Sequence, residues 1–165
     1  MAEESSSRGW KAYIPIMVLV SFTLLAGLAK QLDYGSWQMM PFMRDFMGFF
    51  LVVFAMFKFF DLPGFADGFQ MYDLLAKRTR AYALVYPFIE LGLGLWLLTG
   101  LVPLVAFGVL LAVMAFGAVG VALALHRGLD INCACMGTTL KVPLSTVALT
   151  EDVGMAGMAA VMLIA

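Results

Sequence analysis

The sequence predicts an all-α membrane protein: a polytopic helix bundle with a four-helix core and an additional N-terminal helix. The first observation behind this prediction is composition. Hydrophobic residues make up 63% of the 165 residues and charged residues only 13%, whereas a soluble chain has about 25% charged residues. A water-soluble core of this size is too small to bury so much apolar surface, so most of it must face lipid or other helices within the membrane.

The second observation is that hydrophobic residues form continuous runs, as in FGVLLAVMAFGAVGVALAL. Inside a bilayer every backbone N–H and C=O group needs a partner within the protein, so a spanning segment is a helix or a strand of a closed barrel. Barrel strands alternate apolar and polar residues over about ten positions. The continuous runs therefore predict helices.

Five runs approach the length of about 20 residues that a helix needs to cross a bilayer. They cover residues 12–29, 41–60, 81–98, 103–125 and 143–165. We therefore divide the chain into residues 1–30, an N-terminal tail with the first helix, and residues 39–165, a membrane domain. The first helix follows Arg8 and Lys11 like a signal peptide, but its apolar stretch exceeds the usual core of about 7–15 residues, which favours a retained signal anchor.

Lysine and arginine are distributed unequally over the two ends of these spans. Only Lys30 and Arg44 fall on one side, while the other side carries Arg8, Lys11, Lys77, Arg78, Arg80, Arg127 and Lys141. Because cytoplasmic loops carry the excess of basic residues, we expect a multi-pass protein of the bacterial inner membrane with a cytoplasmic N-terminus. The loop over residues 126–141 is then cytoplasmic too. The net charge of −1 excludes a basic nucleic-acid-binding protein.

This loop contains both cysteines, Cys133 and Cys135. Two thiols separated by one residue can bind a soft ion such as Cu(I) or Hg(II). They can also form a disulfide, whose tight ring would be strained and easily reduced. Cytoplasmic thiols are kept reduced, which disfavours a structural disulfide. A four-ligand zinc site is excluded, because His126 is the only histidine.

Besides Asp45, near the start of the second span, three carboxyl groups lie deep within the predicted spans. Glu151 and Asp152 are about 12 Å beyond the start of the fifth span at 1.5 Å per residue, and Glu90 lies at a similar depth in the third. An ionised carboxylate there costs about 2.5–3.5 kcal/mol, so each needs a partner, a proton or a cavity. Glu90 and Glu151 could share a proton or hold a cation if they face each other. Lys58 could instead neutralise Glu90, and Tyr86, one turn earlier, is placed to donate a hydrogen bond to it.

Methionines follow Glu151 on the same helical face, at positions 155, 158 and 162. A row of thioethers beside a carboxylate suits the passage of a soft cation, although methionine also fills irregular gaps between helices. On the first interpretation the predicted metal ligands are Cys133, Cys135, Glu151, Met155 and Met158. The remaining intramembrane charged residues are Glu90, Lys58 and Asp152.

Two further patterns concern packing and the membrane surface. Small residues at Gly117, Gly120 and Ala124 share one helical face, which allows a close helix contact, although loose packing is an alternative. Residues 72–78, YDLLAKR, are typical of an amphipathic turn whose basic end rests on anionic headgroups.

Three blocks resemble the MauE branch of the MauE/DoxX membrane family: MRDFMGFFLVVFAMFKFFDLPGFADGFQMYDLLAKR, YPFIELGLG and CACMGTTLKVPLSTVALTED. The resemblance runs from about Met39 to the C-terminus. It implies a redox-associated membrane protein, because the namesake supports maturation of a disulfide-rich methylamine dehydrogenase subunit. By position, Cys133 and Cys135 correspond to the family's C-x-C, Glu90 to its third-span Glu and Lys58 to its second-span Lys. Met136 departs from the namesake's CFG-like ending.

The residues and the resemblance together leave three functions open, of which we expect the first, passage of a soft metal ion. Similar relatives are often fused to a heavy-metal-associated domain, which implies that the chain passes Cu(I) or Hg(II) through the Met and Glu residues to the dithiol, with a separate heavy-metal-associated domain protein as partner. The namesake instead implies a thiol redox protein that supports disulfide formation in an exported enzyme, with Cys133 and Cys135 as the catalytic pair and a thioredoxin-like partner. A non-catalytic scaffold is the third. We favour a transport or accessory protein over an enzyme, in contact with membrane lipid and with a homo-oligomer open.

Overall fold

All regular secondary structure in the described part of the chain is helical. The computed structural model describes the backbone of residues 2–128 and 144–165, with side chains for residues 14, 16–128 and 149–165. The elements are α1 (Ala2–Gln31), the short 3-10 helix η1 (Leu32–Tyr34), α2 (Met39–Phe60), α3 (Leu62–Tyr72), α4 (Arg80–Thr99), α5 (Pro103–His126) and α6 (Leu144–Ile164). The predicted all-α class is confirmed.

Four helical segments among the described residues are long and apolar enough to cross a membrane. They are Ile16–Tyr34, Met39–Phe60, Arg80–Thr99 and Pro103–His126, which coincide with the first four predicted spans. A multi-pass membrane protein is thus confirmed at this level, while the face of the membrane on which each end lies stays a prediction. Helix α6 occupies the place of the fifth predicted span.

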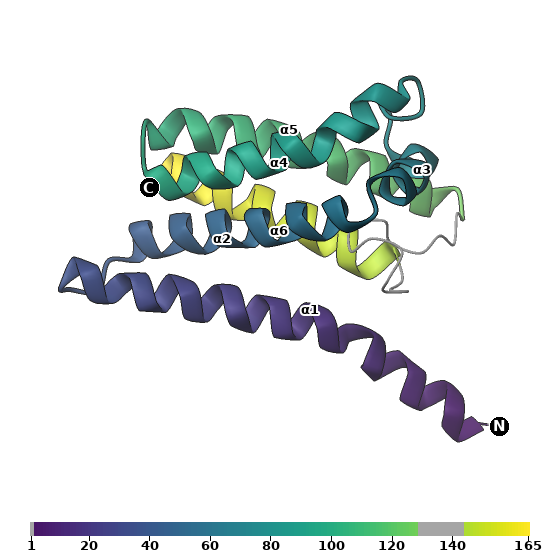
Figure 1. Cartoon of the computed structure of the whole chain (residues 1–165), viewed down its shortest axis with the longest axis horizontal. Coiled ribbons are helices and arrows are strands. Elements are labelled where there is room, and N and C mark those ends of the chain that lie inside the picture. Colours follow the sequence, from purple (N-terminus) through teal and green to yellow (C-terminus); the bar gives the residue numbers. More distant parts are fainter. Residues whose placement is uncertain (1, 129–143) are drawn as a thin grey trace.

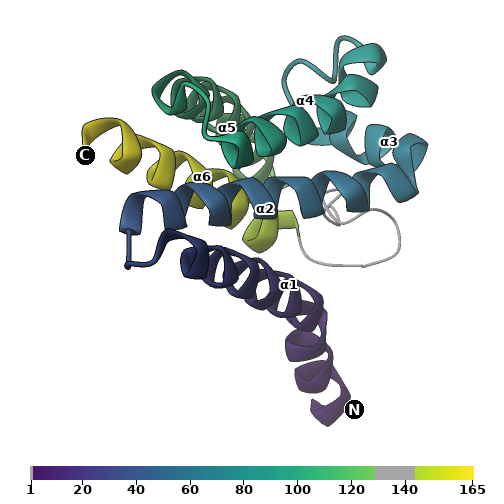
Figure 2. The same cartoon turned by 60° about the vertical axis from the view of Figure 1, so that its left-hand side comes forward.

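The bundle consists of two helix pairs and an outer helix. Helix α2 packs along α4, and α5 packs along α6, while α1 lies against α2 on the outside (Figure 1). Both views show α1 leaving the bundle toward its N-terminus (Figure 2). This is the predicted arrangement of four core helices plus an N-terminal helix.

Glycines allow close backbone contacts at two places. A Cβ atom at Gly94 of α4 would lie 2.9 Å from the carbonyl oxygen of Gly48 of α2, so these helices are in backbone contact where they cross. On α5, a Cβ at Gly120 would lie 3.2 Å from the carbonyl oxygen of Tyr72, and one at Gly117 would lie 2.9 Å from a carboxylate oxygen of Asp152. The close contact predicted for the small-residue face of α5 is confirmed.

Helix α3 lies between the second and third predicted spans, where no helix was predicted. Pro63 sits in its first turn, where its missing N–H costs nothing. The carboxylate of Asp61 accepts a hydrogen bond from the backbone N–H of Gly64 at 2.9 Å and so caps the helix. Its buried face was nevertheless visible as helical spacing: Phe65, Ala66, Phe69 and Tyr72. The helix packs across α4 and α5 at one end of the bundle.

The turn after α3 is organised by Asp73. One of its carboxylate oxygens accepts hydrogen bonds from the backbone N–H groups of Leu75 and Ala76, at 2.9 and 2.8 Å. Burial raises the pKa of the Asp73 carboxyl above its ordinary value, and these two hydrogen bonds oppose that shift. The amphipathic turn predicted over residues 72–78 therefore begins as the last residue of α3 and continues as a hydrogen-bonded turn.

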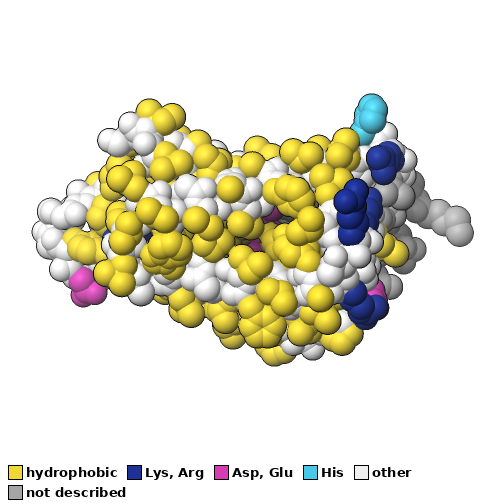
Figure 3. All heavy atoms as spheres, turned by 90° about the horizontal axis from the view of Figure 1, so that it is seen from above, with side chains coloured by type: hydrophobic (Ala, Val, Ile, Leu, Met, Phe, Trp, Pro, Cys, Tyr) yellow, Lys and Arg dark blue, Asp and Glu magenta, His cyan; other side chains and the backbone are white. Residues whose placement is uncertain are grey.

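The molecular surface is apolar along its middle and charged at its ends. Figure 3 shows hydrophobic side chains over most of one face, with lysine, arginine and histidine side chains gathered at one end. This is the end at which α2 stops, α4 begins and α5 stops. An apolar band bounded by charged residues is the surface expected for a protein embedded in a bilayer.

Candidate functional site

Lys58 and Glu90 form a buried ion pair between α2 and α4. The ammonium nitrogen of Lys58 lies 2.5 Å from Oε2 of Glu90, and their side chains are 4% and 1% exposed. Of the three partners that the sequence allowed for Glu90, the structure brings two close to it as expected. Lys58 is bonded directly, and the carboxyl group of Glu151 lies within hydrogen-bonding reach.

Glu151 and Asp152 complete the cluster from α6. Both are buried, with 8% and 9% of their surface exposed, and both are close enough to Lys58 for an electrostatic attraction. Gly117 of α5 makes room for Asp152, because a side chain at that position would collide with its carboxylate. Three carboxyl groups and one ammonium group are thus enclosed between the two helix pairs. We call Lys58, Glu90, Glu151 and Asp152 the charged cluster.

Four aromatic side chains cover the charged cluster, and we call Phe54, Phe65, Phe69 and Tyr86 the aromatic wall. The ammonium nitrogen of Lys58 lies 5.3 Å from the ring centre of Tyr86, 5.5 Å from that of Phe65 and 5.9 Å from that of Phe54. Cation–π contacts at these distances help to hold a buried ammonium group. Phe69 stacks on Phe65, with ring centres 5.1 Å apart, and lies at a tilt against Tyr86, with ring centres 4.6 Å apart.

The placement of Tyr86 differs from the sequence prediction. The sequence predicts that it donates a hydrogen bond to Glu90, four residues later, but its ring packs against that of Phe69 at a tilt of 36° and faces Lys58 instead. Phe65, Phe69 and Tyr72 were not predicted as site residues at all, because they belong to the helix that the sequence interpretation missed. Their helical spacing was the signal that could have found them.

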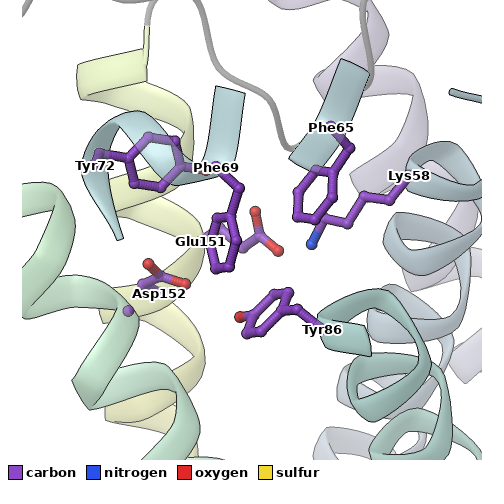
Figure 4. A pocket seen from close by; sticks show the side chains of 8 residues that line it. Lys58, Phe65, Phe69, Tyr72, Tyr86, Glu151 and Asp152 are labelled. Atoms are coloured by element: carbon purple, nitrogen blue, oxygen red, sulfur yellow. The ribbon is translucent and has the colours of Figure 1, made fainter. Parts of the chain in front are cut away.

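A small cavity lies inside the cluster (Figure 4). Its volume is about 20 Å³, and its walls are Lys58, Phe65, Phe69, Tyr72, Tyr86, Gly117, Glu151 and Asp152. Figure 4 shows the carboxyl group of Glu151 between the ammonium group of Lys58 and the carboxyl group of Asp152, and the hydroxyl group of Tyr86 directed toward Asp152. The space accommodates one water molecule with several polar neighbours. Burial raises the pKa of the Tyr72 hydroxyl group well above its ordinary value of 10, so this residue of the cavity lining keeps its proton.

A second polar cluster lies at the opposite end of the bundle and ties α1 to α2 and α4. Asp45 is fully buried and accepts hydrogen bonds from Arg44 at 2.8 Å, Tyr34 at 3.0 Å and Lys30 at 3.4 Å. Lys30 also donates to the carbonyl oxygen of Leu98, near the end of α4. This cluster has an evident structural role, since its charges are paired with one another.

The predicted metal ligands fall into two groups. Cys133 and Cys135 lie outside the described residues, so their role stays a prediction. On α6, Met155 and Met162 are buried in the hydrophobic core, and Met158 packs against it. In the described ranges, no group of three or more His, Cys, Asp or Glu side chains is arranged to hold a metal ion. Packing between helices accounts for these thioethers as observed.

Residues 11–165 match the family described as methylamine utilisation protein MauE. The chain belongs to the MauE family. The match covers the charged cluster, the aromatic wall and the cysteine-bearing segment, and it supports a membrane protein associated with methylamine utilisation. Membership of the MauE family does not by itself place the chain among relatives fused to heavy-metal-associated domains. Neither a curated protein nor a solved structure matches the chain significantly.

Proposed function

We propose that this MauE family protein is a membrane thiol redox protein that supports disulfide formation in an exported enzyme of methylamine utilisation. The observation that carries the proposal is the position of the charged cluster. It lies between α5 and α6 on one side and α2 and α4 on the other, toward the end of the bundle where α5 stops and α6 starts. The segment that joins these two helices contains Cys133 and Cys135.

The proposed chemistry is thiol–disulfide exchange. A thiolate of the partner attacks a Cys133–Cys135 disulfide, which forms a mixed disulfide and releases one cysteine of the pair as a thiolate. The second partner thiolate then attacks the mixed disulfide, so the partner leaves with a new disulfide and Cys133 and Cys135 remain as a dithiol. A membrane quinone accepts the two electrons and two protons of the dithiol and restores the disulfide. The partner that exchanges with the pair is a thioredoxin-like protein or the exported enzyme itself.

Trapping the mixed disulfide tests this function. In Cys135→Ser, the Cys133 thiolate can attack a disulfide of the oxidised partner, which forms a mixed disulfide and releases one partner thiolate. No second cysteine of this chain can resolve the adduct, so it should accumulate and be identified by mass spectrometry after non-reducing purification. The matched control is Cys133→Ser with Cys135→Ser, which should yield no adduct. If neither single variant, Cys133→Ser or Cys135→Ser, traps a thioredoxin-like or exported protein, the redox function is wrong.

The side of the membrane on which the thiols react decides which partner the pair meets. An impermeant thiol reagent applied to intact cells and to inverted vesicles measures it. Labelling from the cytoplasmic face agrees with the distribution of lysine and arginine and requires a thioredoxin-like intermediary. Labelling from the opposite face allows direct exchange with the exported enzyme and contradicts the predicted orientation.

The soft-metal function, in which the dithiol binds Cu(I) or Hg(II), is separated from the redox function by one titration. Purified protein is titrated with each ion, and the double cysteine-to-serine variant is the control. Stoichiometric binding that disappears in the variant, combined with no trapped adduct, would replace the redox proposal by metal binding at Cys133 and Cys135.

A further inference from the structure

The charged cluster carries more negative than positive charge. Lys58 contributes one ammonium group, whereas Glu90, Glu151 and Asp152 contribute three carboxyl groups. Full ionisation would therefore leave two negative charges without a positive partner among the described residues. Isolated charges at such depth are costly in a bilayer. The remaining groups that face the cluster are Tyr72 from α3, Asp73 from the following turn and Tyr86 from α4, and α5 contributes only Gly117 at the cavity. None of these supplies a further positive charge.

One of the two carboxyl oxygens of Glu90 lacks a hydrogen-bond donor among the described residues. Oε2 of Glu90 accepts from Lys58, but Oε1 is completely buried and has no donor among the described residues. The carboxyl group of Glu151 lies within hydrogen-bonding reach of Glu90. Two ionised carboxylates repel each other and offer only acceptors, so such a contact is favourable only when one of the two carries a proton.

We propose that the charged cluster is a proton-binding site in which Glu90 and Glu151 share one proton. The protonated carboxyl group donates to the ionised one, which supplies the missing donor to Oε1 of Glu90. One proton also removes one of the two excess charges. All of these groups belong to the described helices, so the proposal does not depend on the chemistry of the cysteines.

The volume of the cavity favours a proton rather than a metal cation as the bound species. The cavity of about 20 Å³ holds one water molecule and is too small for a hydrated ion. The described residues also include no group of three or more acidic, histidine or cysteine ligands arranged around a metal position. Lys58 moreover lies directly against Glu90, at the position that a cation would need.

Asp152 and the cavity provide the route by which the proton exchanges. Glu90 is 1% exposed, whereas Glu151 and Asp152 retain 8% and 9%. Figure 3 shows acidic side-chain atoms at the bottom of a hollow in the apolar face of the bundle. A water molecule in the cavity would connect Glu151 with Asp152, toward which the hydroxyl group of Tyr86 is directed (Figure 4).

Infrared spectroscopy of the full chain in phosphatidylcholine vesicles tests the proposal. A protonated carboxyl group has a carbonyl stretch separated from that of carboxylates, and this stretch shifts in D₂O. We expect the native protein to show the band at neutral pH and to lose it at alkaline pH. Glu151→Gln and Glu90→Gln should each remove at least half of its intensity.

The matched control is Asp67→Asn. It also converts a carboxyl group to an amide, but Asp67 lies on the surface, paired with Arg80, so the band should be unchanged. Absence of the band in the native protein at neutral pH overturns the proposal, as does a band of full intensity in both glutamine variants. The measurement on the native protein in H₂O and D₂O decides the matter even if a variant does not fold.

Discussion

The ammonium nitrogen of Lys58 on α2 lies 2.5 Å from Oε2 of Glu90 on α4, although the two residues are 32 positions apart in the chain. The pair joins the two helices whose backbones also touch where Gly48 meets Gly94. Three aromatic rings have their centres within 5.9 Å of the Lys58 ammonium nitrogen. Because the two side chains are only 4% and 1% exposed, the pair is shielded from bulk solvent. Its strength should therefore be measurable as an energetic coupling between the two side chains.

We expect Lys58→Met to lower the free energy of unfolding by about 3–5 kcal/mol, because it leaves the carboxylate of Glu90 buried without its partner. Glu90→Gln should be similarly destabilising. The double variant should lose much less than the sum of the two single variants, which thermal unfolding in detergent micelles can measure. Strictly additive losses would show that the two charges are not coupled.

The contact between Gly48 and Gly94 predicts a sensitive position on α4. In Gly94→Ala the new methyl group would meet the carbonyl oxygen of Gly48 at 2.9 Å, and backbone cannot move aside cheaply. We expect the free energy of unfolding to fall by about 1–3 kcal/mol. Gly92→Ala is the matched control on the same helix, because nothing lies within 4 Å of a Cβ there. Equal effects of the two substitutions would contradict the close crossing.

Gly117 should control the environment of Asp152. The methyl group of Gly117→Ala would lie 2.9 Å from Oδ2 of Asp152, which is the end of a side chain and can shift. We expect a smaller loss of stability than for Gly94→Ala but a change in the infrared band of the protonated carboxyl groups. Gly108→Ala on the same helix faces open space and should leave both quantities unchanged. An unaltered infrared spectrum of Gly117→Ala would count against a role of Asp152 in proton exchange.

The polar cluster at the other end should hold α1 in place. Asp45→Ala removes the fully buried acceptor of Lys30, Arg44 and Tyr34 and leaves two cations without their carboxylate. We expect a loss of about 3–5 kcal/mol, against about 1 kcal/mol for Tyr34→Phe, which removes a single hydrogen bond. Unfolding midpoints of the two variants compare these effects. A loss for Asp45→Ala no larger than that for Tyr34→Phe would mean that the ion pairs contribute nothing.

The raised pKa of the Asp73 carboxyl group predicts that the stability of the protein depends on pH. Burial raises the pKa of its carboxyl group in the folded state, so the folded protein binds this proton more tightly than the unfolded chain does. The resulting stabilisation is present below the ordinary pKa of about 3.9 and is lost as the pH rises through the higher folded value. Asp73→Asn keeps an oxygen acceptor for Leu75 and Ala76 without the charge. It should therefore be at least as stable as the native protein near neutral pH, and a clear loss of stability there would contradict this assignment.

Much of the candidate site was accessible from the sequence. Glu90, Glu151 and Asp152 stand out because ionisable residues are costly within apolar runs, and counting residues from the helix starts placed Glu90 and Glu151 at similar depth. Lys58 was recognised as a partner for the same reason. Phe65 and Phe69, which α3 contributes to the aromatic wall, were not predicted. Pro63 and Gly64 at the start of α3 resemble a turn, and a helix of 11 residues is too short to be recognised as a span.

The sequence by itself determined that the chain is an all-α membrane protein, approximately where four of its spanning helices lie, and that Glu90, Glu151 and Asp152 need compensation for their charge. These properties follow from local rules, since hydrocarbon requires every backbone polar group to be paired within a helix. Only the tertiary structure decided that Glu90 is bonded to Lys58 and adjoins Glu151, and that Tyr86 faces Lys58 rather than Glu90. Those contacts join different helices. Their geometry depends on how closely neighbouring helices approach at glycines such as Gly94 and Gly117. The pattern of residues within a single helix does not contain that information.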